Sequence, residues 1–209
     1  SGGPSLAPPG ASARYRRPRR WTPPMPDAEP ETLASFLLTL RKAERPHGGP
    51  FYYASPNADL LGVVIERVTG ARFADLVSDL LWKPMGAKAN AEVTVDAIGT
   101  PRTAGGVSVT ARDLARLGEL LRNHGVGDRE AWQQGRNVDL PNGRYRSQWY
   151  QSGEAGNAFC AIGIHGQWLY VDPGTETVIV KLSSQPDPLG DEENRDIFTF
   201  FRALCRRAI

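Results

Sequence analysis

A change of period near Arg146 constrains the fold more than any other feature of the sequence. Before it, apolar residues recur at helical spacing in four segments, within residues 31–44, 55–70, 71–86 and 110–125. After it, short apolar stretches alternate with turn residues, and a last helical segment follows that carries Ile197, Phe198, Phe201 and Leu204 on one face. Helices, then consecutive strands, then a closing helix predict an α+β fold in which an antiparallel sheet is flanked by helices.

The strand segments are short and rich in aromatic and β-branched residues. They are predicted at Gln148–Tyr150, Ala158–Gly163, Gln167–Val171 and Thr177–Ser183. The last two are separated by Asp172-Pro173-Gly174-Thr175, whose composition is typical of a hairpin loop. The segment Thr177–Ser183 is nearly all apolar or β-branched, as expected of a central strand.

The predicted domain organisation is simple. Residues 1–30 are rich in Pro, Gly, Ser, Ala and Arg without any period, and are expected to form an extended loop. Residues 31–209 are expected to form one domain portion, mainly helical over 31–125 and made of the sheet and the terminal helix over 146–209. A chain of 209 residues is long enough to bury a core of this size.

Composition argues against several classes of protein. The formal net charge of +2 is too small to indicate a nucleic-acid partner, and the one basic run, Arg14–Arg20, lies among prolines and reads as a solvated loop. No apolar run approaches the roughly 20 residues of a membrane-spanning helix, and the N-terminus has no signal-peptide pattern, which favours a cytoplasmic protein. Two cysteines and three scattered histidines share no metal-binding spacing. The sequence does not determine the oligomeric state, and both a monomer and an oligomer are compatible with it.

One stretch, Phe51–Gly62, concentrates groups that could do chemistry. Pro56 suits the first turn of a helix, Ser55 just before it is a good N-cap, and Leu60, Leu61 and later apolar residues continue the helical face. Tyr53 lies one turn ahead of the helix N-terminus, where the positive end of the helix dipole favours a phenolate. Tyr53 is therefore a candidate general base. The alternative is an aromatic loop that only packs in the core.

At this point the sequence resembles the serine β-lactamase-related hydrolases, which include class C β-lactamases, DD-peptidases, esterases and 6-aminohexanoate-dimer hydrolases. The resemblance rests on segments that follow one another in the family's order, namely Tyr53-Ala54-Ser55 with the helix after it, Gly105-Gly106 with Thr110–Gly118, and Ala161–Pro173. The Gly166-Gln167-x-x-x-Val171-Asp172-Pro173 pattern is most similar to the 6-aminohexanoate-dimer-hydrolase branch. The matching segments span about residues 31–204. The resemblance implies a β-lactamase/transpeptidase-like fold and an acyl-enzyme mechanism on a small-molecule amide or ester, without metal or organic cofactor.

The resemblance also implies roles for individual residues. Tyr53 would be the base or proton relay, and the backbone N–H of Ile164 would supply half of an oxyanion hole. Ser55, where many relatives have Asn, and Gly163 would contact the substrate. His165 would line the pocket or be an ordinary polar loop histidine, and Trp149 would wall an acyl site or simply pack in the sheet; both pairs of alternatives stay open.

The sequence departs from the family pattern in two places. Ala161-Ile162-Gly163 replaces the Lys-Thr-Gly that binds a β-lactam carboxylate, which argues against β-lactams as the main substrates. No Ser-x-x-Lys nucleophile motif occurs in the chain, and the nearest approach, Thr39-Leu40-Arg41-Lys42, reads as a solvated helix face.

Two hypotheses follow from the missing motif. In the first, the chain is the C-terminal portion of an enzyme, and a missing N-terminal segment of the same fold supplies the serine, so that the chain alone is inactive. We then also expect the terminal-helix face with Ile197, Phe198, Phe201 and Leu204 to lack part of its cover, so that the chain alone is marginally stable or associates through that face. In the second, the protein is a non-catalytic binding or regulatory relative that lacks Ser-x-x-Lys.

Overall fold

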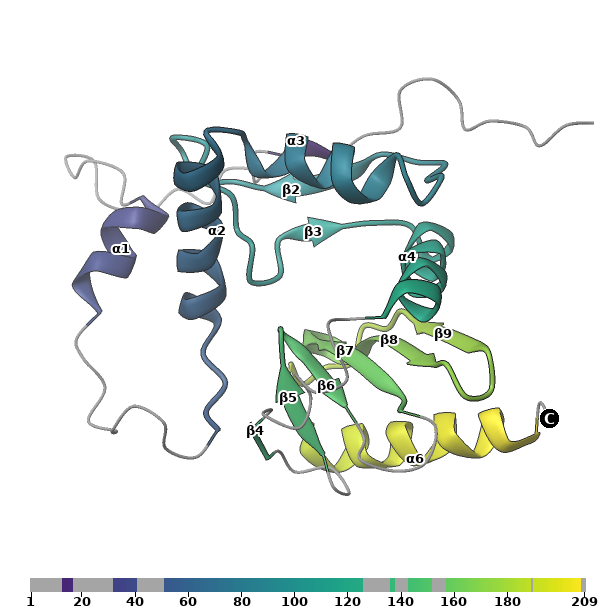
Figure 1. The fold of residues 1–209 in the computed structure, drawn as a ribbon. Helices are drawn as coiled ribbons and strands as arrows, with labels where there is room; N and C mark the ends of the chain where they lie inside the picture. Colours follow the sequence, from purple (N-terminus) through teal and green to yellow (C-terminus); the bar gives the residue numbers. More distant parts are fainter. Residues whose placement is uncertain are drawn as a thin grey trace, which may run out of the picture. The chain divides into compact units, whose positions relative to one another are not determined.

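The computed structural model describes residues 13–16, 32–40, 51–125, 136–137, 143–151, 157–188 and 190–207 (Figure 1). The chain divides into two compact units. Unit 1 comprises Ser1–Gly48 and Tyr52–Thr110, and unit 2 comprises Gly49–Phe51 and Ala111–Ile209. The helix that ends the predicted helical part, α4 (Ala111–His124), thus belongs to the same unit as the sheet that follows it.

The described residues of unit 1 form three helices and a small sheet. The helices are α1 (Leu33–Thr39), α2 (Ser55–Thr69) and α3 (Phe73–Val77), which continues as a π-helix, η1 (Ser78–Trp82). The sheet has the order β1 (Ala13–Arg16), β2 (Ala91–Thr94), β3 (Val107–Ser108). Its core packs Ala74 and Trp82 against Ala87, Ala91 and Val93.

The small sheet differs from the sequence expectation. β1 and β2 run parallel and β2 and β3 antiparallel, so this sheet is mixed, whereas only antiparallel pairing was predicted. β1 lies within residues 1–30, for which an extended loop was predicted; the remainder of that range, most of the basic run included, lies outside the described residues. The helix predicted over residues 31–44 is described as far as Thr39.

The helix α2 begins one residue earlier than predicted. Its N-cap is Ala54, which makes no side-chain cap hydrogen bond, so the prediction of Ser55 as the N-cap was wrong; Ser55 is the first helical residue. Pro56 lies in the first turn, where its missing N–H costs nothing. The helix ends at Gly70, whose φ of 67° is left-handed and therefore suits glycine.

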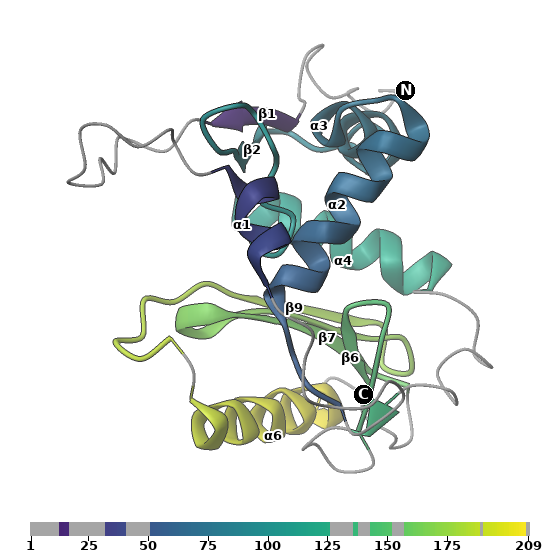
Figure 2. The same ribbon diagram turned by 90° about the vertical axis from the view of Figure 1, so that its left-hand side faces the viewer.

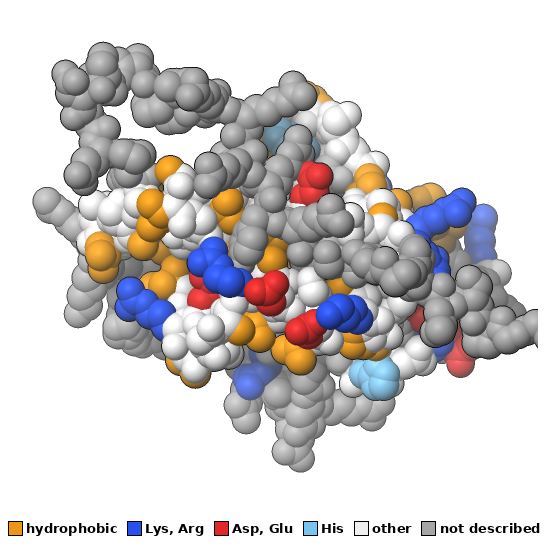
Figure 3. Space-filling model, turned by 90° about the horizontal axis from the view of Figure 1, so that it is seen from above, with side chains coloured by type: hydrophobic (Ala, Val, Ile, Leu, Met, Phe, Trp, Pro, Cys, Tyr) orange, Lys and Arg blue, Asp and Glu red, His pale blue; other side chains and the backbone are white. Residues whose placement is uncertain are grey.

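The apolar face of α2 was expected to be buried, and most of it is exposed. Leu60, Leu61 and Val64 are 51%, 46% and 45% exposed, while the buried residues of the helix are Asp59 and Gly62. The buried face is instead the one that meets the loop before β3, where a Cβ at Gly62 would lie 2.4 Å from the Thr103 side chain. Figure 3 shows hydrophobic side chains interleaved with charged ones on one face of the molecule. Exposed apolar residues also occur outside α2, for example Leu80 and Ile98.

Unit 2 contains a six-stranded antiparallel sheet whose strands pair in sequence order. They are β4 (Arg136–Asn137), β5 (Arg144–Arg146), β6 (Trp149–Gln151), β7 (Phe159–Gly163), β8 (Gln167–Asp172) and β9 (Thr177–Lys181). The register places Ile162 opposite Trp168 and Gly163 opposite Gln167. The predicted hairpin around Asp172–Thr175 is confirmed by the β8–β9 pairing.

The two faces of this sheet are covered by helices from opposite ends of unit 2 (Figure 2). On one face, Leu114, Leu117 and Leu121 of α4 pack against a buried cluster of Phe159, Leu169 and Val171. On the other, α6 (Asp191–Arg207) packs against Cys160, Trp168 and Tyr170. Residues of β7 and β8 contribute to both clusters, because successive side chains of a strand point to opposite faces of the sheet.

The expectation of an uncovered terminal helix was wrong for its two central residues. Phe198 and Phe201 are 2% and 4% exposed. Phe201 packs edge-on against Trp168 at 5.7 Å, and Phe198 against Tyr170 at 5.8 Å. Only the flank of the helix with Leu204, which is 41% exposed, fits the expectation.

Candidate functional site

Tyr53 lies in the extended segment that leads into α2, two residues before the first helical residue. Its side chain is 49% exposed, so it does not pack in a core as the alternative interpretation required. The first-turn N–H groups of the helix carry a partial positive charge close to this position. The Tyr53 side chain is therefore accessible to solvent just ahead of the helix N-terminus. Ser55, two residues later, is partly buried.

The loop that carries the glycine pair is fixed to α2 by a buried carboxylate. Asp59 is 2% exposed; its Oδ1 accepts a hydrogen bond from the Ala104 N–H at 2.8 Å, and its Oδ2 lies 3.2 Å from Arg102 Nε. Thr103 donates its hydroxyl to the Ala58 carbonyl at 2.7 Å. A Cβ at Gly106 would lie 2.5 Å from the Arg102 carbonyl. Glycine at 106 thus permits a close approach of the loop to itself.

Gly163, Ile164 and His165 lie where β7 turns into β8. Gly163 ends β7, and Ile164 begins a short 3-10 turn, η2 (Ile164–Gly166), where it is 60% exposed. His165 has φ 57° and ψ 27°, and Gly166 has φ 78°, so two successive residues are left-handed. His165 is strained in this conformation because its Cβ crowds the backbone, which costs about 1–2 kcal/mol for a non-glycine residue.

The His165 ring is engaged by its own unit. Its Nδ1 lies 2.9 Å from the Gln185 carbonyl oxygen. A carbonyl oxygen only accepts, so Nδ1 carries a hydrogen in this contact. One edge of the ring is thus used to hold the turn, and the role of His165 as a pocket residue stays a prediction.

Four further residues support this turn, and the sequence analysis assigned none of them a role. Gln167, Lys181 and Gln185 make hydrogen bonds to the His165–Gly166 backbone, and Ser183 holds the Gln167 side chain. A glycine after His165 was the available signal, because it marks a turn with positive φ. The partners could not be identified in this way, since three of them, Lys181, Ser183 and Gln185, come from the end of β9 and the segment after it.

Trp149 is placed in β6 with its ring edge-on to Phe159, at 5.4 Å between centroids. It packs against the buried cluster on the α4 side of the sheet. This contact accounts for a tryptophan at the position, and a role as the wall of an acyl site stays a prediction. Tyr53 and Ser55 belong to unit 1, and Trp149, Gly163, Ile164 and His165 to unit 2. A single site that contains all six therefore also stays a prediction.

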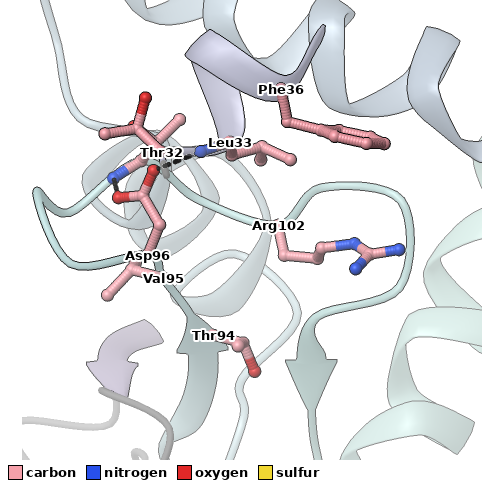
Figure 4. Close-up of a pocket in the computed structure, with 8 residues that line it drawn as sticks. Thr32, Leu33, Phe36, Thr94, Val95, Asp96 and Arg102 are labelled. Atoms are coloured by element: carbon pink, nitrogen blue, oxygen red, sulfur yellow. Dashed lines mark hydrogen bonds between the residues drawn. The ribbon is translucent and has the colours of Figure 1, made fainter. Parts of the chain in front are cut away.

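A pocket of about 260 Å³ lies within unit 1 and contains none of the predicted site residues. Asp96 closes one side of it, because its carboxylate accepts hydrogen bonds from the N–H groups of Leu33 and Thr100, both at 2.8 Å (Figure 4). Phe36 and Arg102 line the other side. The Asp96 carboxylate could attract a cation, but its oxygens already accept hydrogen bonds from backbone N–H groups. We therefore interpret the pocket as a packing gap between α1 and the end of β2.

In the described part of the chain, no three or more His, Cys, Asp or Glu side chains are grouped as metal ligands would be. No helix in the same residues is both long enough and apolar enough to cross a membrane. The expectation that catalysis needs no metal stays a prediction.

Comparisons with known proteins agree on the relationship. The family described as Beta-lactamase matches residues 1–203. The 6-aminohexanoate-dimer hydrolase of Paenarthrobacter ureafaciens is 41% identical over 181 residues, which are 78% of this chain and 46% of that enzyme. The resemblance stated from the motifs is thereby confirmed.

A solved structure agrees as well. A Bacillus anthracis protein with the provisional name 6-aminohexanoate-dimer hydrolase superposes with a TM-score of 0.74 and 26% identity, over 84% of this chain and 48% of that one. The β-lactamase/transpeptidase-like fold predicted from the sequence is confirmed. The chain spans about half the length of these relatives.

Proposed function

The chain belongs to the beta-lactamase family, and on that premise we propose that it carries part of the active site of a serine hydrolase. The substrate class is a small amide or ester. The observation that carries the proposal is the 41% identity to an enzyme named as a 6-aminohexanoate-dimer hydrolase. Because the chain covers 46% of that enzyme, the activity of the whole protein is part of the proposal.

The proposed reaction has two steps. The oxygen of a serine attacks the carbonyl carbon of the substrate, while its proton passes through the Tyr53 oxygen to the leaving amine or alcohol. Water then attacks the acyl-enzyme, which releases the acid and returns the proton to the serine oxygen. In both steps the negative charge on the carbonyl oxygen is held by two backbone N–H groups, those of Ile164 and of the serine itself.

Two features support this assignment. Tyr53 is half exposed and lies just ahead of the N-terminus of α2. Ile164 lies at the end of a sheet strand, so its N–H is carried by a rigid element. Ser55, Gly163, His165 and Trp149 are the proposed substrate contacts, without any cofactor.

The nucleophile is the open part of the proposal. The 209 residues contain no Ser-x-x-Lys, and we propose that this motif lies in an N-terminal segment of the same fold. The alternative is a non-catalytic relative that lacks the motif altogether. The full reading frame separates the two, because only the enzyme requires an upstream Ser-x-x-Lys.

The activity test uses the full-length protein with short acyl esters and linear ω-amino-acid amides. We expect turnover, and Tyr53→Phe should lower kcat by about 100-fold to 10,000-fold, as for loss of a general base. Tyr52→Phe is the matched control, since it removes the same atom from the neighbouring exposed ring and should leave kcat unchanged. A full-length protein without turnover on any substrate would support the non-catalytic alternative. Turnover that survives Tyr53→Phe would refute the role of Tyr53. The cytoplasmic location expected from the sequence stays a prediction.

A further inference from the structure

The turn that presents Ile164 is held by a network of hydrogen bonds. The partners come from β8, from the end of β9 and from the segment after β9. The side-chain amide of Gln167 pairs with the backbone of Ser183 at both ends: its Nε2 donates to the Ser183 carbonyl, and its Oε1 accepts from the Ser183 N–H at 3.1 Å. β9 ends at Lys181, so Gln167 continues the pairing between β8 and the chain after β9 with a side chain in place of a strand.

The same side chain also reaches the strained residue. Gln167 Nε2 donates to the carbonyl oxygen of His165 at 3.2 Å. That oxygen also accepts from the Gln185 N–H at 3.2 Å, and the His165 N–H donates to the Pro188 carbonyl at 3.2 Å. Both backbone polar groups of His165 are therefore satisfied by groups outside the turn, as a left-handed non-glycine residue requires if it is to persist.

Gly166 is held in the same way. Lys181 Nζ donates to its carbonyl oxygen at 2.9 Å. A Cβ at Gly166 would lie 2.3 Å from Gln185 Oε1 and 2.9 Å from Lys181 Nζ, so the two side chains cover this residue closely. The turn cannot shift without breaking these contacts.

The Ile164 N–H belongs to the peptide between Gly163 and Ile164, which lies between two fixed points. On one side, Gly163 pairs with Gln167 in the β7–β8 ladder. On the other side, His165 is fixed by the hydrogen-bond network just described. Gln167 takes part in both, through its backbone on the first side and its side chain on the second.

We propose that Gln167 is a positioning residue of the oxyanion hole, which holds the turn so that the Ile164 N–H keeps its direction. This inference rests on the proposed function of Ile164. An oxyanion donor stabilises the transition state more than the bound substrate, and a displacement of about 1 Å can cost about 100-fold in rate. Loss of the Gln167 side-chain bonds should therefore affect kcat rather than KM.

The test compares two variants of the full-length protein. Gln167→Met removes the hydrogen bonds and keeps the shape, and kcat should fall about 10-fold to 100-fold while KM stays within about 3-fold. Gln151→Met makes the same chemical change in β6 of the same sheet and should leave both constants near those of the unmodified protein. Thermal melting of both variants shows that they are folded under the assay conditions.

Hydrogen exchange of the His165 amide, whose acceptor is Pro188, gives a second readout that does not require activity. Its exchange should accelerate in Gln167→Met and not in Gln151→Met. The inference is overturned, and the proposed function left intact, if the unmodified protein is active and Gln167→Met keeps its kcat. The same holds if the fall in kcat is accompanied by a rise in KM of similar size. A wild-type protein without turnover overturns both, and unchanged exchange shows that Gln167 does not hold the turn.

Discussion

Asp59, buried in α2, and Ala104, 45 residues later, are joined by a hydrogen bond of 2.8 Å from the Ala104 N–H to the carboxylate. The other carboxylate oxygen meets the Arg102 guanidinium at 3.2 Å. The amphipathic period of α2 predicts its apolar residues as the buried ones, yet this charged residue is buried and joins the helix to the loop before β3.

Replacement of Asp59 should therefore lower the free energy of unfolding by more than the loss of an exposed ion pair does. Asp59→Ala leaves the Ala104 N–H without an acceptor and Arg102 without its partner, and should cost about 2–4 kcal/mol of unfolding free energy. Asp59→Asn keeps one acceptor oxygen and should cost about 1–2 kcal/mol. Urea unfolding of the chain measures both. Asp79→Ala, which removes an exposed pair with Lys83, is the control and should stay within about 0.5 kcal/mol.

Gly118 sets the distance between α4 and the sheet. A Cβ at this position would lie 2.5 Å from Val178 Cγ1 and 2.9 Å from Leu169 Cδ1. Although alanine is the better helix former, we expect Gly118→Ala to destabilise by about 1–3 kcal/mol, because overpacking outweighs propensity. Adding Val178→Ala should recover part of the loss. Additive effects of the two substitutions in denaturant unfolding would show that Gly118 and Val178 do not compete for the same space.

Three buried groups predict a loss of stability at alkaline pH. Burial raises the pKa of the Cys160 thiol and of the Tyr170 hydroxyl, and it raises the pKa of Cys205 as well. Each group binds its proton more tightly when folded, so the unfolded chain releases protons first. Stability should be unaffected by these groups below about pH 8.5 and should fall above it. Melting temperatures between pH 7 and pH 10.5 test this.

Cys160→Ala with Cys205→Ala should flatten the decline at alkaline pH. Part of it should remain in the double variant, because Tyr170 still titrates with a raised pKa. A melting temperature that stays constant up to pH 10.5 in the unmodified chain would contradict the prediction.

Trp149 offers a way to separate packing from substrate binding. If its main contact is the edge-on one with Phe159, Trp149→Ala should destabilise by about 3 kcal/mol, in the range of aromatic truncations in cores. Trp149→Phe should recover more than half of that loss. Unchanged stability of Trp149→Ala, together with a raised KM in the full-length protein, would instead favour the acyl-site role.

The fold was predictable where the sequence period and its packing partner are close together in the chain. The β8–β9 hairpin follows from two β-branched segments around Asp172–Thr175, and Leu114, Leu117 and Leu121, which recur at helical spacing in the predicted segment 110–125, pack from α4 against the sheet. The prediction that the apolar residues of α2 are its buried ones was wrong. The helical period shows that a helix is amphipathic, but it does not show which elements cover the apolar face. Ser55 failed as an N-cap by one residue, within the usual uncertainty of helix ends.

The residues of the candidate site stay a prediction from motifs, and the groups that support them could not be predicted from the sequence. Tyr53 and Ile164 were proposed from motifs, and both are exposed in the structure. Gln167 was part of a motif but had no assigned role, since its partner Ser183 is brought beside it only by the pairing of β8 with β9. Hydrogen bonds between a side chain and a distant backbone group leave no periodic trace in a sequence.

The order of the six-stranded sheet has a consequence for how unit 2 folds. Each strand pairs with the next one along the chain, so every pairing closes a short loop, which favours rapid assembly. Phe51 is different: it comes from far upstream, and its ring lies 4.5 Å from Tyr145. We expect the sheet to assemble before Phe51 docks. Phe51→Leu should then speed unfolding in stopped-flow experiments and leave the refolding rate unchanged, so that this aromatic residue acts as a latch on a sheet already formed.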